Sequence, residues 1–261
     1  MARQFLSFPC EGAMLAATLD RPEGAVKAGL LIVTGGNELR SGAFNGQAQL
    51  ADALAQAGYA VLRYDRRGVG DSEGENGGFR SALPDIAAAM QALRSALPDG
   101  TRIIAHGNCD AATSLMLAAG GGADGLVLSN PWPHEGEEAA APSVAVLRSH
   151  YRQRLMNWGA IKRLLTGQVN LSKLLASLMS AAKPTPAPPS LVAQMRQGLE
   201  QFDGPVRILL AQRDATAQAF LGLWDKQDQR LNTCPDATHA FVESHARIWL
   251  TEHLIAALDG G

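Results

Sequence analysis

Residues 101–120 read TRIIAHGNCDAATSLMLAAG, and this stretch decides the fold of the chain. It opens with a short β-branched run at Ile103 and Ile104, which is typical of a buried strand. Small and polar residues follow at 106–111, and Leu115 and Leu117 then lie in a helical pattern. The stretch therefore predicts a strand, a sharp turn and a helix in direct succession, with Cys109 at the apex of the turn.

Strands and helices alternate through most of the remaining chain. A continuous apolar run, typical of a strand buried on both faces, occurs at 28–34, and the segments at 59–64, 125–129 and 206–210 predict further strands, with a short one near 230–233. Two segments near the start, 4–8 and 14–19, predict an antiparallel hairpin. Helical spacing predicts helices over 47–58, 84–97 and 244–258, and around Phe220. This alternation predicts an α/β fold with a mostly parallel central sheet and helices on both faces.

One segment interrupts the alternation. Residues 134–200 contain no convincing strand, and a proline-rich connector, KPTPAPPS, occupies 183–190. We expect a helical cap, or lid, inserted after the sixth strand and covering the carboxyl edge of the sheet. Residues 1–133 and 201–261 would then form the α/β core.

Composition excludes several classes of protein. The net charge of -2 over 261 residues argues against a general nucleic-acid binder. The chain has only three cysteines, an odd number, so a disulfide framework is unlikely. This sparse cysteine content favours a reducing compartment. No apolar run is long enough for a signal peptide or a membrane span. We therefore expect a cytoplasmic protein, with no cofactor and no metal.

Two segments compete as the site of a nucleophile. GDSEG at 70–74 matches the G-x-S-x-G pattern literally, whereas GNCDA at 107–111 matches it with cysteine and a final alanine. The pattern requires a strand directly before the nucleophile and a helix directly after it. Only the second segment has both, so Cys109 is the predicted nucleophile and Ser72 a polar loop residue. The alternative for Cys109 is a buried core cysteine.

The partners of such a nucleophile follow in the order acid, then histidine. Asp214 follows the strand at 206–210, and His239 precedes the last helix, so both are predicted to reach the same edge of the sheet. Asp214 is alternatively a helix cap, and Glu135 is a second candidate acid. The rivals of His239 are His134, His150, His245 and His253. His245 and His253 lie eight residues apart and are expected on the surface of the final helix, and His106 is expected to pack beneath the elbow.

An oxyanion hole would come from backbone N–H groups. One donor is expected from Asp110, the residue after the nucleophile, and the other from Gly36 or Asn37 in the loop after the third strand. The helix that begins at Asp110 and a protonated His239 would both lower the pKa of a Cys109 thiol.

Several further segments carry a family resemblance. They are Gly35-Gly36, VLRYD at 61–65, RGVGDSEG at 67–74, NCDAA at 108–112, NPW at 130–132 and LLTGQVNL at 164–171. With these the sequence resembles the α/β-hydrolase superfamily, and more narrowly the type-one hydrolase family associated with the exosortase A protein-sorting system. The resemblance implies the α/β-hydrolase fold and a gene that accompanies exopolysaccharide production.

These observations lead to two hypotheses of function. The first is a Cys109–His239–Asp214 hydrolase that cleaves an ester or thioester through an acyl-thioenzyme, with acyl transfer as a variant, on a small or lipid-like acyl substrate. The second is a non-catalytic, hydrolase-like binding module in an exopolysaccharide or protein-sorting pathway. The substituted nucleophile and the missing second glycine of the motif motivate the second.

Charge is divided unevenly along the chain. Residues 139–199 carry eight basic and no acidic residues, which leaves 15 basic and 25 acidic residues elsewhere, a net charge of -10. One interpretation is a solvated helix face packed on an acidic body. The other is attraction to an anionic substrate or a membrane surface.

Overall fold

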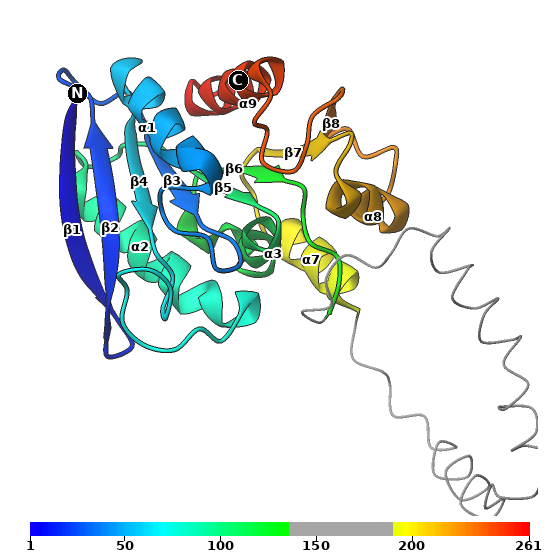
Figure 1. Cartoon of the computed structure of the whole chain (residues 1–261), viewed down its shortest axis with the longest axis horizontal. Helices are drawn as coiled ribbons and strands as arrows, with labels where there is room; N and C mark the ends of the chain where they lie inside the picture. The colour runs from blue at the N-terminus through cyan, green and yellow to red at the C-terminus, as the bar shows by residue number, and fades with distance from the viewer. Residues whose placement is uncertain (136–189) are drawn as a thin grey trace, which may run out of the picture. The chain divides into compact units, whose positions relative to one another are not determined.

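A computed structural model describes residues 1–135 and 190–261, and these contain one sheet of eight strands in the order β1-β2-β4-β3-β5-β6-β7-β8 (Figure 1). The strands are β1 (Ala2–Cys10), β2 (Ala13–Arg21), β3 (Gly29–Val33), β4 (Ala60–Tyr64), β5 (Ile103–Asn108), β6 (Gly125–Ser129), β7 (Val206–Ala211) and β8 (Leu231–Cys234). The helices are α1 (Gly46–Gln56), α2 (Leu83–Ala96), α3 (Asp110–Leu117), α7 (Leu191–Glu200), α8 (Ala215–Leu223) and α9 (Ser244–Leu258). The chain divides into two compact units, Met1–Pro133 with Leu191–Gly261, and His134–Ser190.

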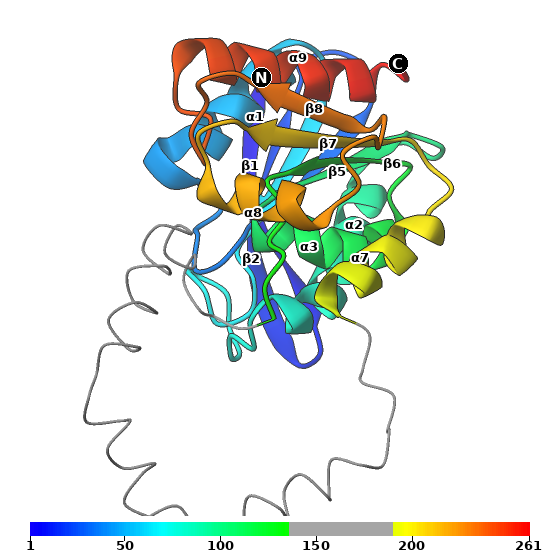
Figure 2. The same ribbon diagram turned by 90° about the vertical axis from the view of Figure 1, so that its right-hand side faces the viewer.

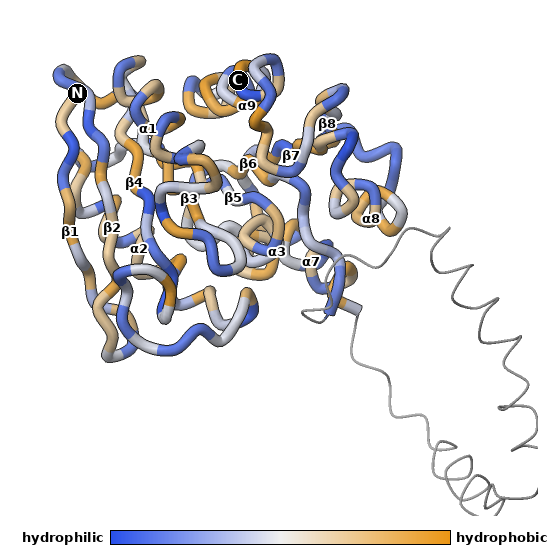
Figure 3. The backbone as a smooth tube through the Cα atoms, viewed as in Figure 1, coloured by the Kyte–Doolittle hydropathy of each residue, from blue (hydrophilic) through white to orange (hydrophobic). Residues whose placement is uncertain are grey.

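The predicted fold class is confirmed. β1 and β2 form an antiparallel hairpin, β2 pairs antiparallel with β4, and all the other pairings from β4 to β8 are parallel. Helices α1 and α9 cover one face of the sheet, and α2, α3, α7 and α8 cover the other (Figure 2). A parallel sheet covered on both faces needs apolar side chains on both sides, which explains the hydrophobic stretches along the central strands (Figure 3).

The register of the parallel strands defines where a site can form. Asn108, the last residue of β5, pairs with Ser129, the last residue of β6, and β7 and β8 pair in parallel as far as Ala211 and Cys234. Parallel strands bring their carboxyl ends to one edge of the sheet, and ligands in open α/β sheets bind outside that edge. The turns after β5, β7 and β8 are therefore neighbours.

Helix α7 differs from the sequence-based expectation. The sequence pattern places residues 191–200 in the cap, but α7 belongs to the first unit and packs on α3. Leu191, Met195 and Leu199 form its buried apolar face, at the i, i+4, i+8 spacing of one helix side. The boundary of the core therefore lies at residue 191, directly after the proline-rich connector. The remainder of the predicted cap, 136–189, lies outside the described residues.

The described residues contain neither a helix that could span a membrane nor a cluster of metal-ligating side chains. No helix in 1–135 or 190–261 has the length and hydrophobicity needed to cross a bilayer. In the same ranges, no three or more His, Cys, Asp or Glu side chains are grouped as a metal site would require.

Candidate active site

Cys109 occupies a strained turn between β5 and α3. Its backbone angles, φ 61° and ψ -127°, are rarely adopted by a residue with a side chain. Neighbouring backbone fixes the turn, because the Cys109 amide donates to Ser129 O at 3.0 Å and the Trp132 amide donates to Cys109 O at 3.2 Å. A Cβ on Gly107 would lie 2.7 Å from the carbonyl carbon of Ala111, so this position needs glycine. The geometry is that of a nucleophile elbow.

His239 and Asp214 lie together at the same edge. His239 Nδ1 and Asp214 Oδ2 are 3.0 Å apart, and the Asp214 side chain is buried whereas that of His239 is half-buried. Asp214 is also the N-cap of α8, since its carboxylate accepts a hydrogen bond from the Ala217 amide at 3.0 Å. Capping and pairing with histidine are thus two functions of one carboxylate. The alternative acid, Glu135, is exposed and belongs to the second unit.

The electrostatics couple His239 to both neighbours. The hydrogen bond to Asp214 and a second one to the Cys109 side chain outweigh burial and raise the pKa of His239 to about 10. Burial opposes the ionisation of Asp214, but the hydrogen bond and positive charge of His239 prevail, so the pKa of Asp214 is lowered. A histidine with such a pKa carries a positive charge at neutral pH and faces the Cys109 side chain as an imidazolium.

The loop after β3 lies against the elbow. The Gly36 amide donates to both carboxylate oxygens of Asp110, at 2.8 and 2.9 Å, and Arg66 pairs with the same carboxylate at 3.6 Å while donating to Gly36 O. A Cβ on Gly35 would lie 2.5 Å from Asp110 Oδ1, so this close approach requires glycine. Of the three backbone amides expected to form an oxyanion hole, that of Gly36 therefore already donates its hydrogen bond to the Asp110 carboxylate. Within 1–135 and 190–261 the Asp110 and Asn37 amides make no hydrogen bond.

The sequence pattern of a protein family described as serine aminopeptidase, S33, matches residues 24–184, more than half of the chain. The chain belongs to the serine aminopeptidase S33 family. It is thereby an α/β hydrolase, in which a cysteine stands at the elbow. No curated protein sequence matches the chain.

Several solved structures have a fold similar to that of this chain. The α/β hydrolase GrgF from Penicillium sp. sh18 has a TM-score of 0.64 and 16% identity, with 98% of this chain and 97% of that chain covered. An α/β serine hydrolase homologue from Coxiella burnetii has a TM-score of 0.61 and 17% identity, with 99% of this chain and 98% of that chain covered. Est1E from Butyrivibrio proteoclasticus, with ferulic acid bound, has a TM-score of 0.59 and 20% identity, with 96% of this chain and 98% of that chain covered. At these identities the similarity establishes the fold of this S33-family chain.

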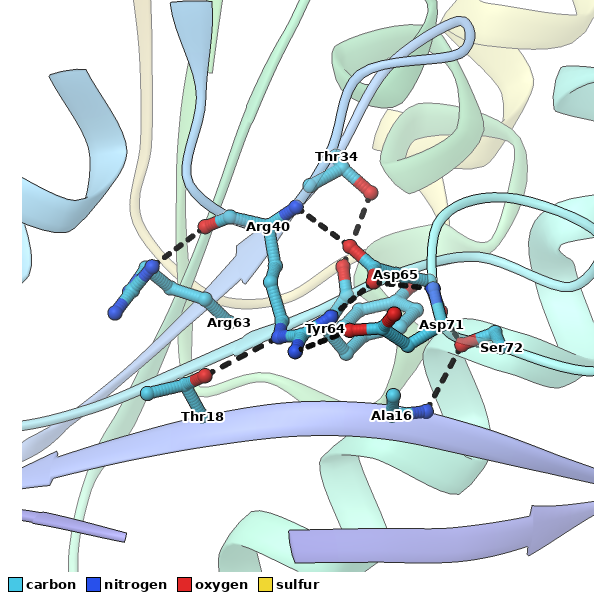
Figure 4. Close-up of polar contacts among 9 residues, drawn as sticks. All are labelled: Ala16, Thr18, Thr34, Arg40, Arg63, Tyr64, Asp65, Asp71 and Ser72. Atoms are coloured by element: carbon cyan, nitrogen blue, oxygen red, sulfur yellow. Dashed lines mark hydrogen bonds and ion pairs between the residues drawn. The ribbon is translucent and has the colours of Figure 1, made fainter. Parts of the chain in front are cut away.

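Ser72 is a structural residue of the S33-family core (Figure 4). Its hydroxyl donates to Asp65 O at 2.7 Å and accepts from the Ala16 amide at 2.9 Å. The adjoining Asp65 carboxylate accepts from the Arg40 amide at 2.6 Å and the Asp71 amide at 3.1 Å, and pairs with the Arg40 side chain. The GDSEG segment thus closes a loop against β2, away from any elbow.

Sequence reasoning missed Glu38 in the loop after β3. Its carboxylate accepts from the Ala43 amide and the Gln47 side chain, each at 2.7 Å. Burial is the main reason that the pKa of Glu38 is raised, and the charges of His239 and Asp110 also act on it. It lines a cavity of about 70 Å³ together with His106, Asn108, Ser129 and Phe241, among others. The signal available in the sequence was an acidic residue close after a buried strand.

Three other histidines of the described residues, His106, His245 and His253, have different surroundings. His106 is buried beneath the elbow, with its Nδ1 at 2.9 Å from Val127 O, and burial lowers its pKa to about 4. His245 lies on α9 near Pro235 O, and His253 packs edge-on against Trp249. His134 belongs to the second unit, and His150 lies outside the described residues.

Proposed function

We propose that this chain is a cysteine-nucleophile hydrolase that cleaves an ester or thioester through an acyl-thioenzyme. The observation that carries the proposal is the chain of contacts from Cys109 at a strained elbow, to His239, to the buried carboxylate of Asp214. Two similar folds add support at the level of reaction class, since one is described as a serine hydrolase homologue and another, Est1E, holds ferulic acid.

The proposed reaction begins from a Cys109 thiolate and a His239 imidazolium. The thiolate attacks the carbonyl carbon, and the oxyanion that forms accepts hydrogen bonds from the Asp110 and Asn37 amides. The carbon–oxygen or carbon–sulfur bond then breaks as the imidazolium donates its proton to the leaving alcohol or thiol. His239 next removes a proton from water, the hydroxide attacks the acyl-thioenzyme, and the acid leaves while the thiolate–imidazolium pair is restored. An alcohol or thiol in place of water gives acyl transfer.

Asp214 orients the imidazole and stabilises its positive charge, as a triad carboxylate does. A carboxylate that accepts from Nδ1 requires the proton to be on that nitrogen, which directs Nε2 toward the sulfur. A reducing, cytoplasmic compartment would keep such a thiol free of disulfides.

The test compares wild type with Cys109→Ala and Cys109→Ser on p-nitrophenyl esters and acyl thioesters, followed by intact-mass analysis of the quenched enzyme. We expect turnover and an acyl adduct in the wild type, and neither in Cys109→Ala. Iodoacetamide labelling has internal controls, because Cys10 and Cys234 are buried and burial raises the pKa of the Cys10 thiol to about 11. A Cys109 that is labelled no faster than Cys10, with no turnover, would overturn the proposal.

A second candidate function is the non-catalytic binding module. The occupied Gly36 amide favours it, because one donor expected for an oxyanion hole is held by the Asp110 carboxylate. Removing a single oxyanion-hole donor lowers turnover about 10²–10³-fold in enzymes of this type. Tight binding of an acyl ester without turnover or adduct, unchanged in Cys109→Ala, is the result that would select the binding module.

We also propose that the protein acts alongside exopolysaccharide production and exosortase A sorting. The support is the resemblance carried by NCDAA at 108–112 and NPW at 130–132. Deleting the gene and measuring exopolysaccharide output, with complementation by wild type and Cys109→Ala, tests both the setting and the need for the thiol.

A further inference from the structure

Two asparagine side chains meet at the backbone carbonyl of His239. Asn108 Nδ2 donates to His239 O at 3.2 Å, and Asn130 Nδ2 donates to the same oxygen at 3.1 Å. The two side chains are also joined to each other, because Asn130 Nδ2 donates to Asn108 Oδ1 at 3.0 Å. Asn108 directly precedes Cys109 in the chain. The carbonyl of the histidine is therefore tied to the base of the elbow.

Asn130 reaches the third part of the site as well. Its Oδ1 accepts a hydrogen bond from the Ala211 amide at 2.8 Å, and Ala211 O in turn accepts from the Asp214 amide at 3.1 Å. Asn130 is fully buried and adopts φ 44°, a left-handed conformation that asparagine tolerates better than most residues. One amide group thus contacts the strand ends or loops that carry all three residues of the proposed triad.

We infer that Asn130, assisted by Asn108, is a positioning residue that sets His239 against Cys109 and Asp214. The inference rests on the proposed function, since it assigns the role of these amides in that triad. Asparagine suits the position because it presents a donor and an acceptor in one rigid plane. Aspartate could accept from Ala211 but would direct a carboxylate at two oxygen acceptors, and alanine would leave buried polar groups unpaired.

The His239 loop has other supports that separate positioning from folding. The Arg213 amide donates to Ala237 O at 2.9 Å, and Thr238 is held by the Glu243 carboxylate through its hydroxyl at 2.7 Å. The loop should therefore remain attached when an asparagine is removed. The histidine ring, which is half-buried, would then sample a wider range of positions relative to the sulfur.

The experiment measures the pH dependence of Cys109 alkylation by iodoacetamide between pH 5 and 10, in wild type, Asn130→Ala, Asn130→Asp and Asn108→Ala. In the wild type we expect fast labelling already at low pH, because the imidazolium stabilises the thiolate. In Asn130→Ala we expect the labelling rate at pH 6 to fall at least about tenfold relative to wild type, because the imidazolium is no longer held against the sulfur. Steady-state kinetics should show a lower kcat, with KM changed much less.

Two matched controls separate positioning from general destabilisation. Asn232 donates to a backbone carbonyl, Arg230 O, at 3.0 Å, away from the site, so Asn232→Ala should keep the wild-type pH profile. Ser72→Ala loses buried hydrogen bonds in another part of the core and should lower the melting temperature without moving the profile. Asn130→Asp lacks the Nδ2 donor to His239 O, so its alkylation profile should shift as that of Asn130→Ala does.

Each outcome decides the inference. A wild-type profile and kcat in folded Asn130→Ala overturn it, because the amide would then be structural. If Asn130→Ala does not fold, Asn108→Ala carries the test, since Asn108 is less buried, and an unmoved profile in that variant overturns the inference. Alkylation does not require turnover, so a shifted profile in an enzyme that hydrolyses nothing contradicts the proposed function and leaves the positioning role standing.

Discussion

At the scale of single residues, the protonation of His239 governs what Cys109 can do. The Asp214 hydrogen bond is the largest contribution to a pKa of about 10 in the folded protein, against about 6.5 for a histidine in an unfolded chain. Because the pKa is raised by folding, the stability that His239 contributes is complete below about pH 6.5 and is lost as the pH rises through about 10. Over the same range the His239 imidazolium that faces the Cys109 side chain loses its proton.

Asp214→Asn tests this coupling with little change of shape. Asparagine is as good an N-cap as aspartate, so α8 should keep its cap. Without the carboxylate charge the pKa of His239 should fall toward 6.5, and turnover should fall by about 10²–10⁴-fold. Stability of the variant, measured by urea unfolding, should decline less between pH 6 and 10 than that of the wild type. If the stability of the variant and that of the wild type decline equally between pH 6 and 10, Asp214 does not set the charge of His239.

Ser72→Ala is the contrasting substitution at the serine of the literal motif. It leaves the Ala16 amide and Asp65 O without their partner, and one unsatisfied buried group costs about 1–3 kcal/mol. We expect lower stability by urea unfolding and an unchanged rate of Cys109 alkylation. Cys109→Ala should show the reverse pattern, with stability close to wild type. Loss of alkylation in well-folded Ser72→Ala would contradict this assignment.

At the scale of elements, the close packing of α7 on α3 makes the end of the inserted segment part of the core. A Cβ on Gly198 would lie 1.9 Å from Met116 O, so the two helices can approach this closely because residue 198 is glycine. Met195 and Leu199 on the same helix are buried in the main core cluster. The position of α7 therefore depends on one small residue as well as on an apolar face.

Gly198→Ala and Gly222→Ala form a matched pair of helical substitutions. Alanine at 198 must displace α7 or α3, and overpacking of this kind costs about 1–3 kcal/mol. Alanine at 222 in α8 meets nothing within 4 Å, so its better helix propensity should stabilise by about 0.5–1 kcal/mol. Urea unfolding should show a lower free energy of unfolding for Gly198→Ala and a higher one for Gly222→Ala, each relative to wild type. Equal effects would mean that α7 does not pack on α3 as described.

At the scale of the whole molecule, burial explains which features the sequence could predict. Strands β3, β4 and β6 are buried throughout and mainly apolar, and the segments at 28–34, 59–64 and 125–129 identify them. Once the strand ends are known, parallel pairing brings the turns at Cys109, Asp214 and His239 to one edge. The fold and the grouping of these three residues follow from the pattern alone.

The remaining features depend on directions of side chains between distant segments. The Asp110 carboxylate turns back to the amide of Gly36, 74 residues away, and no local pattern predicts that contact. Asn130 bridges three chain segments through one amide, and Glu38 is buried by residues from separate elements. For α7, periodicity identifies an apolar face but cannot tell whether that face packs on the core or within an inserted domain.

The division of charge along the chain gives the last prediction. Residues 139–199 carry a net charge of +8 and the rest of the chain -10, and a basic residue near an anionic membrane contributes about 1 kcal/mol of binding. We propose that this segment attracts anionic lipid, and we expect the protein to float with vesicles rich in anionic lipid and to dissociate as salt shortens the Debye length below about 8 Å. Replacing Arg148, Arg152 and Arg154 by glutamine should weaken flotation, whereas replacing Arg3 and Arg94 of the first unit should not. Equal flotation with neutral vesicles would instead support packing of the basic segment on the acidic remainder of the chain.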